Sequence, residues 1–232
     1  MEQNTHVAGF FGKVMSHGDF VMRRLPAGFL REWDNWLQAG LQHSRERLGE
    51  QWLAVYLCSP VWRFALSAGV CGEQAWCGVM IPSLDRVGRY FPLTLAASAP
   101  PAPLLQRLEF DGDWYGQLER LALSSLADGF SLERFDAQVD CLAPLSPAMG
   151  VLPQEGGFAS PAAASWLDIP GLDRLAEALP WLRIQIDDER LAGHCLFWTE
   201  GSPQLPPSLL VSAGLPSAMT FADMLDGRHY RE

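Results

Sequence analysis

Lysine is nearly absent from the sequence. Lys13 is the only lysine among 17 basic residues, which face 27 acidic residues and leave a formal net charge of -10. Residues 1–90 hold 9 basic and 8 acidic residues (+1), whereas residues 91–232 hold 8 and 19 (-11), so the excess acid lies in the later part. Such a surface repels a polyanion. We therefore expect no nucleic-acid partner.

Long apolar runs are also missing. No stretch of 18 or more residues is continuously apolar, so we expect no integral membrane segment. The first six residues, MEQNTH, lack the basic start and apolar centre of a secretory signal. Together these absences predict a cytoplasmic protein. They carry no information on its oligomeric state.

The five cysteines are irregularly spaced and include no Cys-x-x-Cys pair. This spacing argues against a zinc ribbon and a thioredoxin-like redox centre. Several cysteines have apolar neighbours, Cys58 and Cys77 among them, so we interpret them as buried, reduced thiols. We expect no metal ion and no other cofactor.

Common catalytic signatures are absent as well. The sequence has neither the Gly-x-Ser-x-Gly of α/β-hydrolases nor the His-Glu-x-x-His of zinc proteases. A phosphate-binding loop needs four residues between its glycines and Ser or Thr after its lysine. Here two residues separate Gly9 from Gly12, and Val14 follows Lys13. This segment is therefore not interpreted as a nucleotide site.

The hydrophobic patterns that are present predict an α+β fold. Apolar residues spaced three and four apart predict a helix from Pro26 to Gly49. Short connections between alternating segments favour antiparallel pairing. We therefore expect a mostly antiparallel central sheet of about six strands, flanked by helices in a three-layer-like arrangement. Strands are expected within residues 8–13, 62–66, 76–81, 90–95, 182–186, 194–198 and 209–211. Further helices are expected at 113–126, 131–142, 172–179 and 217–225. Asp113, Ser131 and Ser217 are the expected caps of the first, second and fourth of these.

Three local features qualify this pattern. Residues 53–57 fit either a short helix or a strand. Pro92, inside the third predicted strand, indicates an edge position or a bulge. Frequent proline and glycine over residues 141–171 predict a long irregular connection. We expect one domain over residues 1–232, with a motif-dense part (1–99), a helical and proline/glycine-rich part (100–180), and C-terminal strands and a helix (181–232).

One polar cluster lies in a glycine-containing loop after the first predicted strand. It consists of Lys13, Ser16, His17 and Asp19. A histidine near an aspartate suits acid–base chemistry or metal ligation, because imidazole titrates near neutral pH. The structural alternative, which we favour, is that Ser16 and Asp19 hydrogen-bond the backbone of the turn.

A second polar cluster joins two predicted strands and holds Ser83, Asp85, Arg86 and Arg89. Asp85 has three candidate partners in Arg86, Arg89 and Lys13. Alternatively, the two arginines present their guanidinium groups to a carboxylate or a phosphate. We favour structural pairing and keep anion recognition open. We expect the two clusters to be neighbours, because each leaves or enters a predicted strand.

Both clusters fall within segments that resemble the TagF family of bacterial type VI secretion accessory proteins. The resemblance lies in GFFGK at 9–13, SHGDFV at 16–21, SPVWRF at 59–64 and GVMIPSLDRVGRYFPLT at 78–94. LFWTEG at 196–201 and SLL at 208–210 resemble the C-terminal part of the family. The resemblance is dense over residues 9–95 and loose over 100–190.

The resemblance implies regulation rather than catalysis. The family represses type VI secretion assembly post-translationally, alongside the threonine-phosphorylation pathway and the forkhead-associated scaffold protein of that system. We therefore expect a non-catalytic repressor that binds a component of the system, with the scaffold as the expected partner. The two polar clusters are the candidate binding surface. The alternative is a phosphate-ester hydrolase or metal-dependent enzyme that uses His17, Asp19 and Asp85.

Overall fold

The computed structural model describes residues 7–100, 102–145, 191–203 and 205–227. Its strands, in chain order, are β1 (Gly9–Gly12), β2 (Val21–Arg23), β3 (Trp62–Leu66), β4 (Ala75–Ile81), β5 (Leu93–Ala99), β6 (His194–Thr199) and β7 (Ser208–Ala213). They form one antiparallel sheet in the order β2-β1-β5-β4-β3-β6-β7. The predicted α+β class and antiparallel pairing are confirmed, with seven strands in the described part of the chain.

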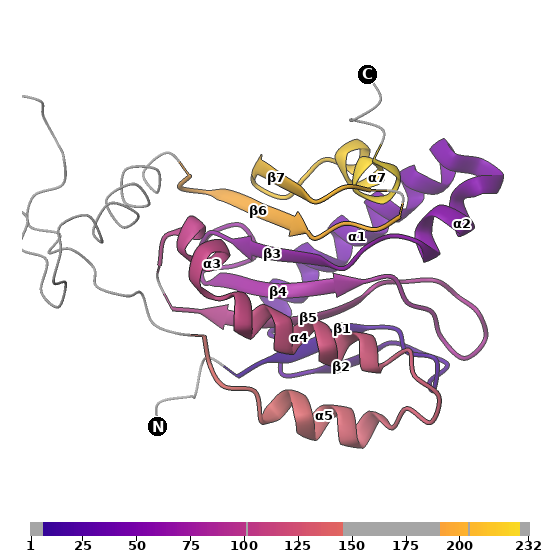
Figure 1. Ribbon diagram of the computed structural model, residues 1–232, viewed down its shortest axis with the longest axis horizontal. Coiled ribbons are helices and arrows are strands. Elements are labelled where there is room, and N and C mark those ends of the chain that lie inside the picture. The colour runs from indigo at the N-terminus through magenta and orange to yellow at the C-terminus, as the bar shows by residue number, and fades with distance from the viewer. Residues whose placement is uncertain (1–6, 101, 146–190, 204, 228–232) are drawn as a thin grey trace, which may run out of the picture.

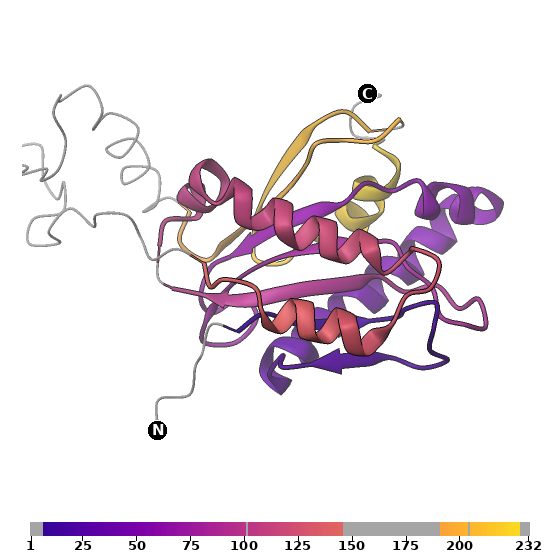
Figure 2. The same ribbon diagram turned by 60° about the horizontal axis from the view of Figure 1, so that its bottom comes forward.

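Helices cover both faces of this sheet, as Figures 1 and 2 show. The helices are α1 (Ala27–Leu48), α2 (Trp52–Leu57), α3 (Leu104–Phe110), α4 (Gly112–Ser124), α5 (Leu132–Asp140) and α7 (Ala218–Asp226), with a 3-10 turn η1 (Gly49–Gln51). Side chains of α1, α2 and α7 pack against one face. Those of α3, α4 and α5 pack against the other. The three-layer arrangement follows because both faces of each central strand are apolar.

Alternation along β3 shows how a strand contributes to both layers. Trp62, Phe64 and Leu66 join the core on the α1 side, and Ala65 joins the core on the α4 side. On the neighbouring strand, Gly78 pairs with Phe64. A Cβ at Gly78 would lie 2.5 Å from the Phe64 ring and 2.3 Å from a backbone oxygen of β5. Glycine is therefore required where this ring crosses β4.

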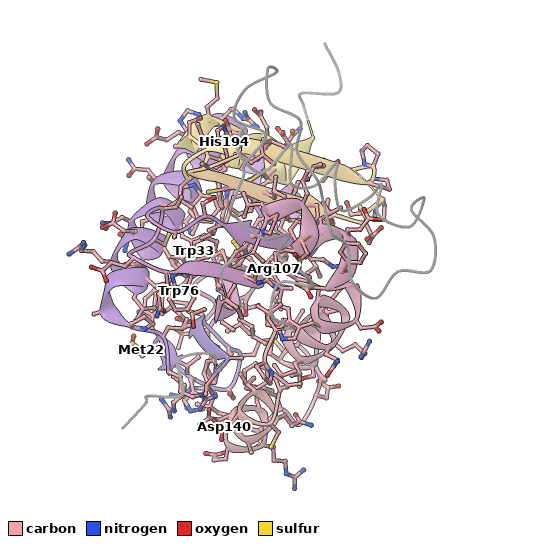
Figure 3. The ribbon with its side chains drawn as sticks, turned by 90° about the vertical axis from the view of Figure 1, so that its left-hand side faces the viewer. Met22, Trp33, Trp76, Arg107, Asp140 and His194 are labelled. Atoms are coloured by element: carbon pink, nitrogen blue, oxygen red, sulfur yellow. The ribbon has the colours of Figure 1, made fainter. Side chains whose placement is uncertain are left out.

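The two cores differ in composition. Twelve of the 24 buried residues on the α1 side are aromatic, against five of 23 on the α4 side. The α1-side indoles are also fixed by hydrogen bonds, such as Trp33 Nε1 to Thr94 Oγ1 at 2.9 Å. In Figure 3, Trp33 and Trp76 lie on the α1 side, whereas Arg107 of α3 lies on the opposite side. Arg107 is itself buried there, 2.8 Å from Asp111.

Several predicted boundaries are corrected by the structure. Pro92 precedes β5, which is a central strand paired with both β1 and β4, so the expected edge position is wrong. Its missing N–H costs the sheet no hydrogen bond because the ladder begins at Leu93. Asp113 lies in the first turn of α4 and is not its N-cap, since the helix begins at Gly112. The ambiguous residues 53–57 are helical.

Other predictions are confirmed. Ser131 and Ser217 cap α5 and α7, each accepting a hydrogen bond from the backbone N–H three residues later. The short edge strand β2 was not predicted. The predicted helix at 172–179, the predicted strand at 182–186 and most of the 141–171 connection lie outside the described residues. No helix in the described ranges is long and apolar enough to cross a membrane.

The cysteine prediction is correct in part. Cys71, Cys77 and Cys195 are buried free thiols, whereas Cys58 and Cys141 are exposed. Cys58 follows the last residue of α2, and Cys141 follows the last residue of α5. Apolar neighbours in sequence do not bury a residue at a helix end, because the chain there leaves the packed surface.

Candidate functional site

Two loops meet at one end of the sheet. The first, residues 13–20, follows β1, and the second, residues 83–91, connects β4 to β5. They are adjacent because β5 pairs with both β1 and β4. Gly12 permits the approach: its φ is 143°, and a Cβ there would lie 2.1 Å from the Pro92 carbonyl oxygen. We call the two loops together the two-loop unit.

An ion pair and three hydrogen bonds connect the loops, one of them from the Arg89 guanidinium to the Gly18 carbonyl oxygen. Lys13 Nζ lies 3.0 Å from Asp85 Oδ2, and both side chains are buried. Ser83 Oγ donates to the Lys13 carbonyl oxygen at 2.7 Å. The Arg86 backbone N–H donates to the His17 carbonyl oxygen at 2.9 Å. The prediction that the two polar clusters are neighbours is confirmed.

Asp85 is the centre of the two-loop unit and is only 1% exposed. Its Oδ2 accepts from Lys13 Nζ and, at 2.7 Å, from Arg89 Nε. Its Oδ1 accepts from the backbone N–H groups of Val87 and Arg89, at 3.0 and 2.9 Å. Of the partners considered for Asp85, the structure shows Lys13 and Arg89. The carboxylate thus shapes the turn as well as neutralising the buried ammonium.

The hydrogen bonds to Asp85 decide its ionisation. Burial alone would raise the pKa of the carboxyl group. The Arg89 amide, the Lys13 ammonium, the Arg89 guanidinium and the Val87 amide all favour the charged form and hold the pKa well below its usual range. Such a carboxylate is a poor proton acceptor near neutral pH. Its geometry and ionisation both suit a structural role.

The base of the second loop is fixed to α2. The Tyr56 hydroxyl accepts from the Ser83 backbone N–H at 3.0 Å and donates to the Ser83 carbonyl oxygen at 2.9 Å. Burial raises the pKa of Tyr56 above its usual range, so the hydroxyl keeps its proton and can donate. Gly88, with φ at 82°, closes the turn.

The first loop carries the remaining predicted residues. Ser16 Oγ and His17 Nδ1 are 2.8 Å apart, and Asp19 Oδ1 accepts from the Phe20 backbone N–H at 2.8 Å. The Asp19 bond is a backbone contact that the structural interpretation anticipated, whereas the hydroxyl of Ser16 contacts the His17 ring instead of the backbone. Within the ranges that the structure describes, no group of three His, Cys, Asp or Glu residues is arranged to hold a metal ion.

Phe20 anchors the first loop to the core while leaving part of its ring outside. Its ring stacks on Phe11 at 5.5 Å and meets Phe91 edge-on at 4.8 Å, measured between centroids. Lys13 Nζ lies 5.1 Å from the same ring. Phe20 nevertheless remains 44% exposed, and Val87 at the tip of the second loop is 65% exposed. The unit therefore presents apolar side chains beside its cations.

The sequence interpretation missed Phe20, Tyr56 and Val87 as parts of this site. A phenylalanine within the polar segment SHGDF was a usable signal for Phe20. An apolar residue between two arginines was a weaker signal for Val87. Tyr56 had none, because its contact with Ser83 spans 27 residues and depends on how α2 packs.

The similarity of the chain to one family model places it among proteins associated with type VI secretion. Residues 9–142 match a family model described as the TagF N-terminal domain, type VI secretion system-associated. Since that match covers more than half of the sequence, the chain belongs to the TagF family.

A solved structure extends the likeness beyond the matched domain. The chain is similar to PA0076 from Pseudomonas aeruginosa PAO1, with 36% sequence identity and a TM-score of 0.78. The alignment covers 95% of this chain and 94% of that one. No curated protein matches the chain.

Proposed function

We propose that the protein is a non-catalytic, cytoplasmic repressor of type VI secretion assembly. It acts post-translationally by binding a component of the system, and the forkhead-associated scaffold protein of the threonine-phosphorylation pathway is the proposed partner. The family membership supports the connection to the secretion system.

The state of Asp85 is the observation that carries the non-catalytic part of the proposal. Of the three side chains in the enzyme alternative, Asp85 is the most buried, and both of its oxygens are already hydrogen-bonded within the protein. One oxygen of Asp19 likewise accepts a hydrogen bond from the backbone of its own loop. The charges of the two-loop unit therefore hold its surface in a fixed shape. A preformed surface suits a binding protein, because it loses less conformational entropy when a partner binds.

A direct test pairs the purified full-length chain with the purified scaffold. We expect a stable complex in a pull-down, and we expect overproduction of the chain to reduce sheath assembly in a cell with an active system. Val87→Asp, which places a charge on the exposed tip, should weaken both effects. Arg120→Ala, on the exposed side of α4, is the matched control and should change neither.

The enzyme alternative is tested in the same preparation. Incubation with a phosphothreonine peptide should release no phosphate, and divalent metals should not raise the melting temperature. Phosphate release that disappears in His17→Ala would overturn the non-catalytic part of the proposal. His17→Ala is suitable because the side-chain hydrogen bond of His17 is to exposed Ser16, so the fold is expected to survive the change.

A further inference from the structure

The two-loop unit carries positive charge on an otherwise acidic chain. Lys13, Arg86 and Arg89 supply three cations, against the carboxylates of Asp85 and Asp19. The chain as a whole has a formal charge of -10. The sign of the charge is therefore reversed locally, at the same place where apolar side chains are exposed.

The two arginines of the second loop have different roles. Arg89 is engaged within the protein: Nε donates to Asp85, and Nη2 donates to the Gly18 carbonyl oxygen. Arg86 is exposed, and among the described residues its guanidinium forms neither a hydrogen bond nor an ion pair. Only its backbone N–H is engaged, by His17. Arg86 is thus the cation that remains available to a partner.

Both guanidinium groups converge on Gly18. Arg89 binds its carbonyl oxygen, and Nη2 of Arg86 lies 3.6 Å from where a Cβ of Gly18 would be. Two cations beside one residue repel each other, and the single negative charge of Asp85 is already shared between Lys13 and Arg89. An external anion placed against Arg86 relieves that repulsion and forms a charge-assisted bond.

We infer that the two-loop unit binds an acidic segment of its protein partner, with Arg86 as the anion-binding side chain and Val87 and Phe20 as the apolar contacts. The inference rests on the proposed function and specifies the partner's chemistry. A carboxylate next to an apolar side chain complements this surface, because the cation and the exposed Val87 are adjacent in sequence. The acidic remainder of the chain disfavours an anionic membrane, which presents a broad negative surface.

The surface is preorganised for such a partner. The carboxylate of Asp85 fixes the turn through two backbone amides, and Tyr56 fixes its base. Little conformational entropy remains to be lost in these loops on binding. Arginine is also enriched at the residues that dominate binding energy in protein interfaces.

The test measures the affinity of the full-length chain for the purified scaffold by calorimetry. We expect Arg86→Ala to weaken binding about 10-fold and Arg86→Glu about 100-fold, as for charge pairs in other interfaces. Raising the salt concentration should weaken the wild type more than Arg86→Ala, because the variant has lost the screened contact. Arg120→Ala should match the wild type. Equal melting temperatures would show that the Arg86 variants remain folded.

The outcomes separate this inference from the proposed function. Scaffold binding that is the same in Arg86→Ala, Arg86→Glu and the wild type overturns the inference and leaves the proposed function standing. No binding by the wild type overturns both. Binding to phosphatidylglycerol vesicles that is lost in Arg86→Glu, without scaffold binding, overturns the inference by assigning the surface to lipid.

Discussion

Two contacts in this molecule join segments far apart in sequence, and they do so by different physical means. The α1–α7 contact is built from packed rings: Trp36 meets Phe221 edge-on at 5.2 Å, and its indole N–H donates to the Pro216 carbonyl oxygen. The two-loop unit is built around a buried ion pair between Lys13 and Asp85. The first contact should respond to changes in volume and the second to changes in charge.

The α1–α7 contact also contains ion pairs, so the two contacts differ in how much packing and charge each contributes. Arg47 lies 2.6 Å from Asp223 and 2.9 Å from Asp226. The side chains of Arg47 and Asp223 are 20% and 25% exposed, against 8% and 0% for Lys13 and Asp85. The side chain of Asp226 is 7% exposed, but Arg47 is the partner in both pairs, so solvent screens them more strongly than the Lys13–Asp85 pair. Packing therefore dominates one contact and charge the other.

The largest effect is expected from Asp85→Asn. The amide removes the negative charge beside the buried Lys13 and the exposed Arg89, and the uncompensated buried cation of Lys13 is strongly destabilising. We expect the greatest loss of chemical stability in this set, measured by urea unfolding at pH 7. Asp19→Asn is the control, because Asp19 is exposed and an amide oxygen can still accept from Phe20. Equal losses in the two variants would show that burial of the charge is unimportant.

Acid should destabilise the wild type through the same carboxylate. The folded pKa of Asp85 is lowered, so its contribution is fully present above the unfolded pKa of about 4 and is lost as pH falls through the folded pKa. Urea midpoints measured from pH 7 down to pH 3 should fall for the wild type. They should fall less for Asp85→Asn, which has no carboxyl to protonate there. Parallel curves would contradict the lowered pKa.

Volume is tested at Gly40 of α1, where a Cβ would lie 2.4 Å from the Phe221 ring of α7. We expect Gly40→Ala to destabilise the protein by about 1–3 kcal/mol, the usual effect of overpacking. Gly28→Ala, in the same helix, meets nothing within 4 Å and should stabilise by up to about 1 kcal/mol through helix propensity. The pair would fail as a test of packing if both changes shifted the urea midpoint in the same direction.

The sequence predicts the packed contact better than the charged one. The period of α1 is visible over 22 residues, and Ser217 and Gly227 mark both ends of α7. That Gly40 faces Phe221 is not predictable, because it depends on how two helices far apart in the sequence pack against each other. The period of a helix predicts which of its residues face the core, but the residues that they contact depend on the tertiary fold.

The candidate site was predictable in its residues and not in its pairings. Lys13 and Asp85 are both candidates in the sequence, but their contact spans 72 residues. The sequence also offers Arg86 and Arg89 as partners, and the structure pairs Asp85 with Lys13 and Arg89 because the amides of Val87 and Arg89 orient its carboxylate inside the turn. The three-residue strand β2 is too short to show any period, so sequence patterns could not reveal it.

The smallest effect expected concerns thiol reactivity, which should differ among the cysteines of the folded protein. Burial raises the pKa of Cys71 and Cys195 to about 12 and that of Cys77 to about 11, so these thiols should react slowly with a disulfide reagent at pH 8. Of the five cysteines, the exposed Cys58 and Cys141 should react rapidly, and all five should react in urea.

Thiol labelling also reports which contact has opened. Cys71 and Cys195 belong to the core on the α1 side, and Cys77 belongs to the core on the α4 side. Loosening α7 through Gly40→Ala should therefore speed labelling of Cys71 and Cys195 more than that of Cys77, as read by mass spectrometry of labelled peptides. Under native conditions, uniform acceleration of all three would mean that the variant opens by global unfolding. The packed contact would then be part of the whole fold's cooperative unit rather than a separately opening layer.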